Sequence, residues 1–275
     1  MLRSPMWIPA LALTCLAFAP TDALGMKSGR AHSAQVTLEK SGAHLRLPAL
    51  DVATFENEDA LREAKAGTAL RYGRVYSAGA IAIGEDSRLG QWTKLADGRM
   101  TWSMEVAAEG ARTLEFAFSS FYLPPTGRLV IRSADGAQEL ATLSDADNPL
   151  KGGLYSAMLS AERAVLELTV SPEMRDAVRV TLSSVIWGYR DPFTAMAAKS
   201  GSCNVDTACP EGDAWRDQIA ATAGYAFSET GDRLMCTGTL MNTGNPEQDR
   251  LHPRLSTAYH CVSSESAAES MVFYW

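Results

Sequence analysis

The sequence predicts an all-β fold, in which residues 70–190 form an antiparallel β-sandwich. Apolar and polar residues alternate there with a period of two, which places the apolar side chains on one face of each strand. Turn residues such as Asp-Gly and Pro-Pro-Thr-Gly recur about every 8–14 positions. No amphipathic segment of helical length interrupts this pattern. Short strands joined by regular turns are typical of a sandwich.

The expected strands follow one another along this region. Residues 71–84 (RYGRVYSAGAIAIG) alternate and end in glycine. The strand after the next Asp-Gly turn has one apolar face, formed by Met100, Trp102, Met104 and Val106. The following strand has a similar face, formed by Leu114, Phe116 and Phe118. Further strands are expected over residues 128–143, 164–172 and 177–190. We expect core packing, rather than carbohydrate stacking, from Trp92, Trp102 and Trp187.

The first 25 residues are typical of a secretory signal. Arg3 gives a positive start, residues 6–19 (MWIPALALTCLAFA) are apolar and uncharged, and small residues follow. This stretch is too short for a permanent membrane span, and no later segment reaches about 18 apolar residues. Cys15 lacks the preceding small residues of a lipoprotein acceptor, so we expect it to be removed with the signal. The protein is therefore expected to be secreted, periplasmic or extracellular, and not a membrane protein.

Two further segments frame the sandwich. Residues 26–69 are predicted to be a surface lead-in, with a short helix in FENEDALREAKAG that stops at Gly67. Residues 191–199 are predicted to be a linker of mostly small residues. The formal net charge is −7 and no basic run is present, so the sequence does not show the clustered positive charge that nucleic-acid binding requires.

The last quarter of the chain differs from the rest because it contains the remaining cysteines, Cys203, Cys209, Cys236 and Cys261. In an oxidising compartment such cysteines are expected to form disulfides. A zinc site that also uses His260 is the alternative, but the spacings lack the paired cysteines of zinc motifs. Strands are expected at residues 223–228 and 234–242. The apolar residues 271–275 are β-prone, and because the sequence stops within them, we expect a truncated domain.

One histidine in this region is a candidate general base, because an imidazole titrates near neutral pH. In serine hydrolysis such a base needs a nucleophilic hydroxyl on one side and an orienting carboxylate on the other. A lone histidine is more often structural. His260, however, follows a predicted strand over Cys236–Leu240 and lies in a second predicted strand, residues 256–261 (STAYHC), that is expected to end in a tight turn.

These segments resemble a known family. The pair CTGTL (236–240) and TAYHC (257–261) is similar to the first β-barrel half of trypsin-like serine proteases. Residues 200–225 (SGSCNVDTACPEGDAWRDQIAATAGY) resemble the mature N-terminus of bacterial lysyl endopeptidases. Residues 70–190, with a W-x4-D-G-x3-W spacing and a closing GYR, are similar to the propeptides of these enzymes. The implied architecture is a signal over 1–25, a sandwich propeptide, and the first part of a trypsin-like barrel over 200–275.

The resemblance implies roles for individual residues. His260 would be the catalytic base, and Cys236 and Cys261 would form the disulfide beside it. Cys203 and Cys209 align with cysteines whose partners lie further along the chain in the family, so here they pair with each other or stay unpaired. The substrate would be a peptide bond in a protein or peptide, with lysine favoured before the cleaved bond. No metal or organic cofactor is implied.

The resemblance also implies a maturation step. Cleavage between Lys199 and Ser200 would release the protease from its propeptide, and a lysine-directed enzyme could cut this bond itself. The alternative is that Lys199 is only an exposed linker charge. The propeptide is expected to contact the protease within the same molecule, both as a folding aid for a β-barrel of high contact order and as an inhibitor.

Three functional hypotheses remain. The first is a secreted serine endopeptidase precursor with a His-Asp-Ser triad, of which only the histidine is present in these 275 residues. On that basis the chain alone is expected to be inactive. The second is an inactive, exported β-sandwich binding protein with a protease remnant. The third, a zinc-dependent hydrolase, lacks the H-E-x-x-H helix that such enzymes use.

Overall fold

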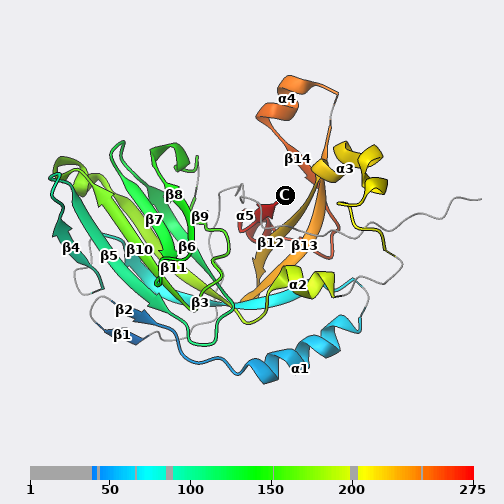
Figure 1. Cartoon of the computed structure of the whole chain (residues 1–275), viewed down its shortest axis with the longest axis horizontal. Helices are drawn as coiled ribbons and strands as arrows, with labels where there is room; N and C mark the ends of the chain where they lie inside the picture. Colours follow the sequence, from blue (N-terminus) through cyan, green and yellow to red (C-terminus); the bar gives the residue numbers. More distant parts are fainter. Residues whose placement is uncertain are drawn as a thin grey trace, which may run out of the picture.

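Strands are the predominant regular elements of the described residues, with short helices between them, in this computed structural model (Figure 1). The structure describes residues 39–41, 44–65, 67–84, 89–150, 152–198, 204–242 and 244–275. The predictions for the signal over 1–25, for Cys15 and Cys203, and for the Lys199–Ser200 bond lie outside these residues.

The strands are β1 (Glu39–Ser41), β2 (His44–Arg46), β3 (Leu70–Ala82), β4 (Gln91–Lys94), β5 (Met100–Ala107), β6 (Thr113–Tyr122), β7 (Arg128–Ser133), β8 (Glu139–Leu143), β9 (Leu154–Tyr155), β10 (Arg163–Val170), β11 (Arg179–Gly188), β12 (Thr222–Glu229), β13 (Asp232–Met241), β14 (Arg254–Ser256) and β15 (Val272–Tyr274). The α-helices are α1 (Val52–Glu63), α2 (Pro192–Ala197), α3 (Arg216–Ala221), α4 (Pro246–Leu251) and α5 (Glu265–Glu269). Short 3-10 turns are η1 (Asp145–Asp147), η2 (Pro172–Ala177) and η3 (Pro210–Trp215).

Two sheets organise these strands. One has the order β1-β2-β5-β10-β7-β8, with β4 beside β5. The other has the order β15-β12-β13-β3-β11-β6-β9, with β14 beside β13. Apart from the parallel pair of β2 and β5, the pairs formed by the named strands are antiparallel. This confirms the predicted all-β fold. The strands after residue 222 form an open continuation of the second sheet, and the described residues do not close into a barrel.

The sandwich core lies between the first sheet and strands β3, β11 and β6 of the second (Figure 1). The predicted faces of β5 and β6 are confirmed, since Trp102, Met104, Val106, Leu114, Phe116 and Phe118 are at most 1% exposed. Trp187 lies in the same core, and Trp92 packs at its edge under the guanidinium of Arg175. Each fully buried side chain of this size contributes about 1.5–3 kcal/mol, so this cluster is the main source of stability.

Two smaller cores lie towards the end of the chain. One consists of residues from β12, β13 and the segment 261–273, together with Ala69, which directly precedes β3. The other combines β3, β6, β9 and β11 with β12, β13 and β15, including Tyr72, Met235 and Tyr274. The predicted boundary near residues 191–199 is therefore crossed both by apolar contacts and by the pairing of β3 with β13. The division into domains stays a prediction.

The segments flanking the sandwich are more structured than a lead-in and a linker. Helix α1 begins earlier than the pattern indicates because Asp51 caps it, accepting hydrogen bonds from the backbone N–H of Thr54 (3.2 Å) and its hydroxyl (2.7 Å). These bonds lower the pKa of the exposed Asp51 carboxyl. Within residues 191–199, Asp191 caps α2 and Pro192 occupies its first turn.

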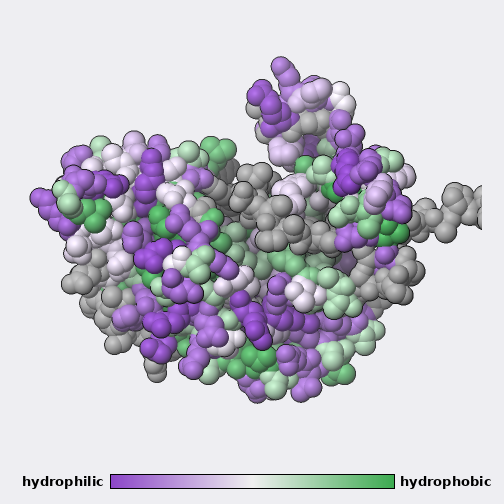
Figure 2. Space-filling view, viewed as in Figure 1, coloured by the Kyte–Doolittle hydropathy of each residue, from purple (hydrophilic) through white to green (hydrophobic). Residues whose placement is uncertain are grey.

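The surface of the C-terminal part is uneven. Helix α4 projects away from the remainder of the molecule, and its visible face is largely hydrophilic (Figure 2). Among the helices in the described part of the chain, none combines the length and apolar composition needed to cross a membrane.

Candidate functional site

His260 lies in a tight turn directly after β14. Strand β14 pairs with β13, placing Ser256 opposite Thr239. The carbonyl of Ala258 then accepts hydrogen bonds from the N–H groups of Cys261 (3.0 Å) and Val262 (3.4 Å). The strand predicted over residues 256–261 is thus shorter and earlier, because it ends at Ser256 and the predicted turn begins there; the His260 side chain is exposed.

The start of this turn is anchored by Thr257. Its hydroxyl donates to the carbonyl of Thr237 on β13 at 3.0 Å. Because a hydroxyl has one proton, the 2.5 Å contact with Tyr225 of β12 has the phenol as donor. Burial raises the pKa of Tyr225, which keeps the phenol protonated for this role. Two neighbouring strands therefore fix the backbone three residues before His260.

The disulfide between Cys236 and Cys261 fixes the other end of the turn. It links residues 25 positions apart with a Cα–Cα distance of 6.2 Å. Cys261 is buried in the C-terminal core. The pairing implied by the family resemblance is thus confirmed, and neither sulfur is available as a zinc ligand. His260 is held between an anchored threonine and a cross-linked cysteine.

The other cysteines give a partial result. Cys209 lies at the start of η3 and is a free thiol in the described part of the chain. Whether it pairs with Cys203 is untested, because Cys203 lies outside the described residues. In the ranges that the structure describes, no three His, Cys, Asp or Glu side chains gather as a metal site would require.

The imidazole of His260 lies close to Gly67, in the segment before β3. Gly67 has a φ of +75°, and a Cβ on it would lie 3.7 Å from Nδ1 of His260. Ala69, two residues later, is buried in the C-terminal core. In a catalytic triad, Nδ1 is the nitrogen that faces the orienting carboxylate. The same Cβ would lie 3.8 Å from Cγ and 3.9 Å from Cε1, and these nearly equal distances place Gly67 over the face of the ring, whereas a carboxylate would approach Nδ1 in the ring plane.

The polar side chains that follow His260 have structural roles. The Ser264 hydroxyl caps α5 by accepting the N–H of Ala267 at 3.2 Å. Ser270 is buried; its hydroxyl accepts the N–H of Ser228 at 2.7 Å and donates to the carbonyl of Ala267. Within the described ranges, His260 has no hydrogen-bond or ion-pair partner. The structure thus positions the predicted base but does not bring an acid or a nucleophile to it.

Removal of the disulfide gives the first testable prediction. Replacing Cys236 and Cys261 together with alanine is expected to lower the free energy of unfolding by about 3 kcal/mol, because the unfolded chain loses a closed loop of 25 residues. Urea unfolding measures this change. Cys209→Ser is the matched control and should change stability by less than about 0.5 kcal/mol. Equal effects of the two changes would contradict a structural role for the disulfide.

The comparisons with known proteins agree with the resemblance. The family model "Lysyl endopeptidase, C-terminal domain" matches residues 197–275. Lysyl endopeptidase of Pseudomonas aeruginosa is 28% identical over 203 residues, covering 67% of this chain and 42% of the relative. The chain therefore spans less than half the length of that relative.

Solved structures give only weak similarity. An exo-β-1,3-galactanase from Phanerochaete chrysosporium matches with a TM-score of 0.21 at 10% identity, covering 42% of this chain and 29% of that one. A β-(1,4)-mannanase of Podospora anserina matches with a TM-score of 0.22 at 11% identity, covering 44% and 28%. Similarity at this level indicates neither a shared fold nor a shared activity.

The family model covers the segment that contains His260, the confirmed disulfide and β12 to β15. The curated relative belongs to the same family and extends the similarity beyond that segment. On this evidence residues 197–275 are similar to the C-terminal domain of lysyl endopeptidases, and the similarity to one such enzyme extends over 203 residues.

Proposed function

We propose that this chain is part of a secreted serine endopeptidase that cleaves peptide bonds after lysine, with His260 as its general base. The observation that carries this proposal is the exposed imidazole in a turn fixed by the Cys236–Cys261 disulfide, within the segment that the lysyl endopeptidase model matches. A base fixed by its backbone loses little entropy when it reaches its productive position.

The proposed chemistry follows the serine hydrolase scheme. His260 accepts the proton of a serine hydroxyl as that oxygen attacks the peptide carbonyl, and returns it to the leaving amine. An aspartate holds the imidazolium from the Nδ1 side. No side chain of the described residues fills either role beside His260, so the proposal requires that other residues of the protein supply the acid, the nucleophile and the oxyanion donors.

Export and a precursor state are parts of the same proposal. The apolar N-terminal stretch and the disulfide support export to an oxidising compartment. The position of Gly67 over the face of the His260 ring supports an inhibitory role for the residues before position 199.

The test is an assay of the secreted protein that carries this chain, on peptides that differ only at the residue before the cleaved bond. We expect kcat/KM for lysine peptides to exceed that for arginine peptides by at least about tenfold, because a pocket that pairs with one cation geometry discriminates against another. A serine-directed fluorophosphonate should abolish turnover, and a metal chelator should leave it unchanged. Turnover lost only to the chelator would contradict the proposal.

A further inference from the structure

Two adjacent residues of opposite charge begin β13. Thr230 and Gly231, both with positive φ, form the two-residue turn between β12 and β13, and Asp232 and Arg233 follow it. The tip of this hairpin lies on β3, where the N–H of Val75 donates to the carbonyl of Gly231 at 2.9 Å. Consecutive side chains of a strand point to opposite faces of the sheet. The hairpin thus presents an anion on one face and a cation on the other.

The cation, Arg233, is fully buried against Glu115 of β6, which is also fully buried. Its Nε and Nη2 lie 2.9 and 2.6 Å from Oε2 of Glu115, whose other oxygen accepts the hydroxyl of Tyr72 at 2.5 Å. Burial raises the pKa of Tyr72, and the Glu115 carboxylate raises it further, so the phenol is a neutral donor. The third nitrogen of Arg233 donates to Ser228 and to the carbonyl of Ser270.

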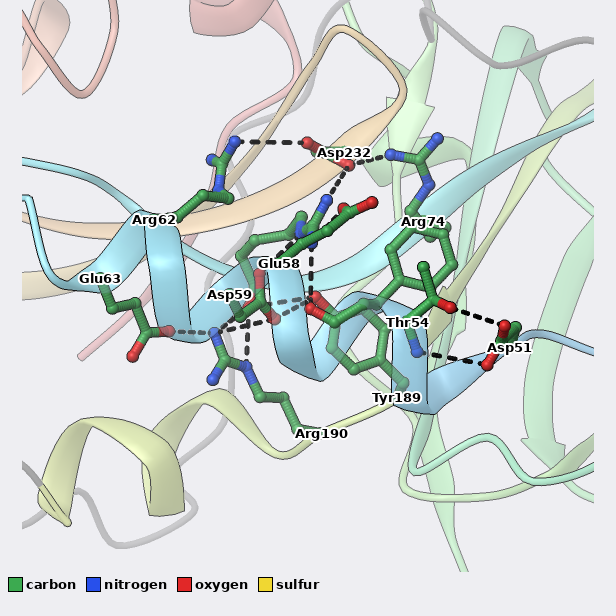
Figure 3. Close-up of polar contacts among 12 residues, drawn as sticks. Asp51, Thr54, Glu58, Asp59, Arg62, Glu63, Arg74, Tyr189, Arg190 and Asp232 are labelled. Carbon is green, nitrogen blue, oxygen red and sulfur yellow. Dashed lines mark hydrogen bonds and ion pairs between the residues drawn. The ribbon is translucent and has the colours of Figure 1, made fainter.

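The anion, Asp232, faces arginines on the opposite face of the sheet (Figure 3). It contacts Arg74 directly, and its carboxylate lies 3.6 Å from Arg71 and 4.0 Å from Arg62. Arg71 is itself held by Asp59 of α1 at 2.8 Å, and Asp59 also accepts the hydroxyl of Tyr189 at 2.7 Å. Within this cluster Arg71 is therefore held by α1 independently of Asp232.

The two hairpin residues lie after residue 230. In the described part of the chain, their charged partners all lie before residue 116: the three arginines around Asp232, and Glu115, which pairs with Arg233. Between them run the β3–β13 pairing and an apolar cluster that includes Leu70 and Met235. Apolar contacts and strand pairing alone tolerate a shift in register, while two buried charges of opposite sign on opposite faces do not. The charges therefore define one docking position.

We propose that residues 204–275 keep residues 39–198 bound as a separate, non-covalent chain once the connection between them is cut. Asp232 and Arg233 hold the two chains together as a two-sided charge clamp. That the connection is cut at all rests on the proposed function. The partner that fits the clamp is a sheet with β3 at its edge, the Glu115 carboxylate of β6 on one face and the arginines of β3 and α1 on the other. After separation both clamp residues lie at a hairpin tip where water can solvate them, so the interface is reversible.

The experiment uses the full chain with a site-specific protease sequence in place of residues 199–203. After cutting, the two fragments of the wild-type chain should co-elute in gel filtration. The Kd of the two fragments is then measured by native mass spectrometry, in a titration with one fragment isotope-labelled. Asp232→Asn should raise Kd by about tenfold and Asp232→Arg by at least about a hundredfold, since the latter adds a cation to the cluster. Each uncut variant is first shown to unfold cooperatively in urea.

Two controls make the result specific. Asp213→Arg reverses an exposed carboxylate in the same fragment and should leave Kd unchanged. Adding Arg74→Asp to Asp232→Arg should recover at least tenfold of the lost affinity by restoring one pair of opposite charges. Separation of the wild-type fragments, or equal effects of Asp232→Arg and Asp213→Arg, would overturn the clamp. No step of this experiment measures hydrolysis. Failure of the clamp is therefore distinguishable from failure of the proposed peptidase activity.

Discussion

Replacing His260 with alanine is expected to lower kcat/KM on a lysine peptide by about 10⁴-fold, which corresponds to about 5.5 kcal/mol of transition-state stabilisation. The loss follows from the proposed role, because a serine hydroxyl is a poor nucleophile without a base to take its proton. The measurement is a peptide hydrolysis assay of the secreted protein that carries this chain, with wild type and variant compared at equal concentrations of folded protein.

His252→Ala is the matched control for this prediction. Both histidines have exposed side chains in the C-terminal part, but His252 follows α4 and lies outside the turn that the disulfide fixes. The control should retain activity within about twofold. Stability should be unchanged in both variants, since exposed side chains without buried partners contribute less than about 0.5 kcal/mol. Full activity of His260→Ala would remove this residue from the mechanism.

Local patterns were sufficient to predict the strands but not what covers them. On β5 the alternation of apolar and polar residues matches the observed burial, because only one face of that strand lies in the core. On β6 the predicted face is buried, but Glu115 and Ala117 of the opposite face are also fully buried. Their cover comes from β12, β13 and β15, more than a hundred residues later in the chain, and no local periodicity carries that information.

The same limit applies to the candidate site. The turn, the disulfide and the position of His260 follow from the family resemblance because they lie within a short, contiguous motif. The position of Gly67 beside His260 does not, since it joins a segment interpreted as a surface lead-in to a residue almost 200 positions later. The sequence does indicate that the helix before β3 is paired, because Asp59 falls on that helix and the next strand begins with arginines, of which Arg71 binds it.

The buried ion pair at the interface leads to the largest expected change in stability. Arg233→Met should lower the free energy of unfolding by about 3–5 kcal/mol, because it leaves the Glu115 carboxylate buried with the Tyr72 hydroxyl as its remaining side-chain partner. Burial by itself would lower the pKa of Arg233, but Glu115 outweighs it and raises that pKa, so the arginine is charged in the native state. Urea unfolding at neutral pH measures the loss.

Further variants separate the cost of an orphaned charge from the cost of lost packing. Arg233→Met combined with Glu115→Leu and Tyr72→Phe removes both charges and the Tyr72 hydroxyl, and should recover at least half of the lost stability. Arg163→Met breaks a comparable Arg–Glu pair with Glu105 at the sandwich surface, where the arginine is 60% exposed, and should cost less than about 1 kcal/mol. If Arg233→Met costs no more than Arg163→Met, the buried pair does not hold the two parts together. If the triple variant recovers nothing, the loss comes from packing around the Arg233 side chain rather than from the uncompensated carboxylate.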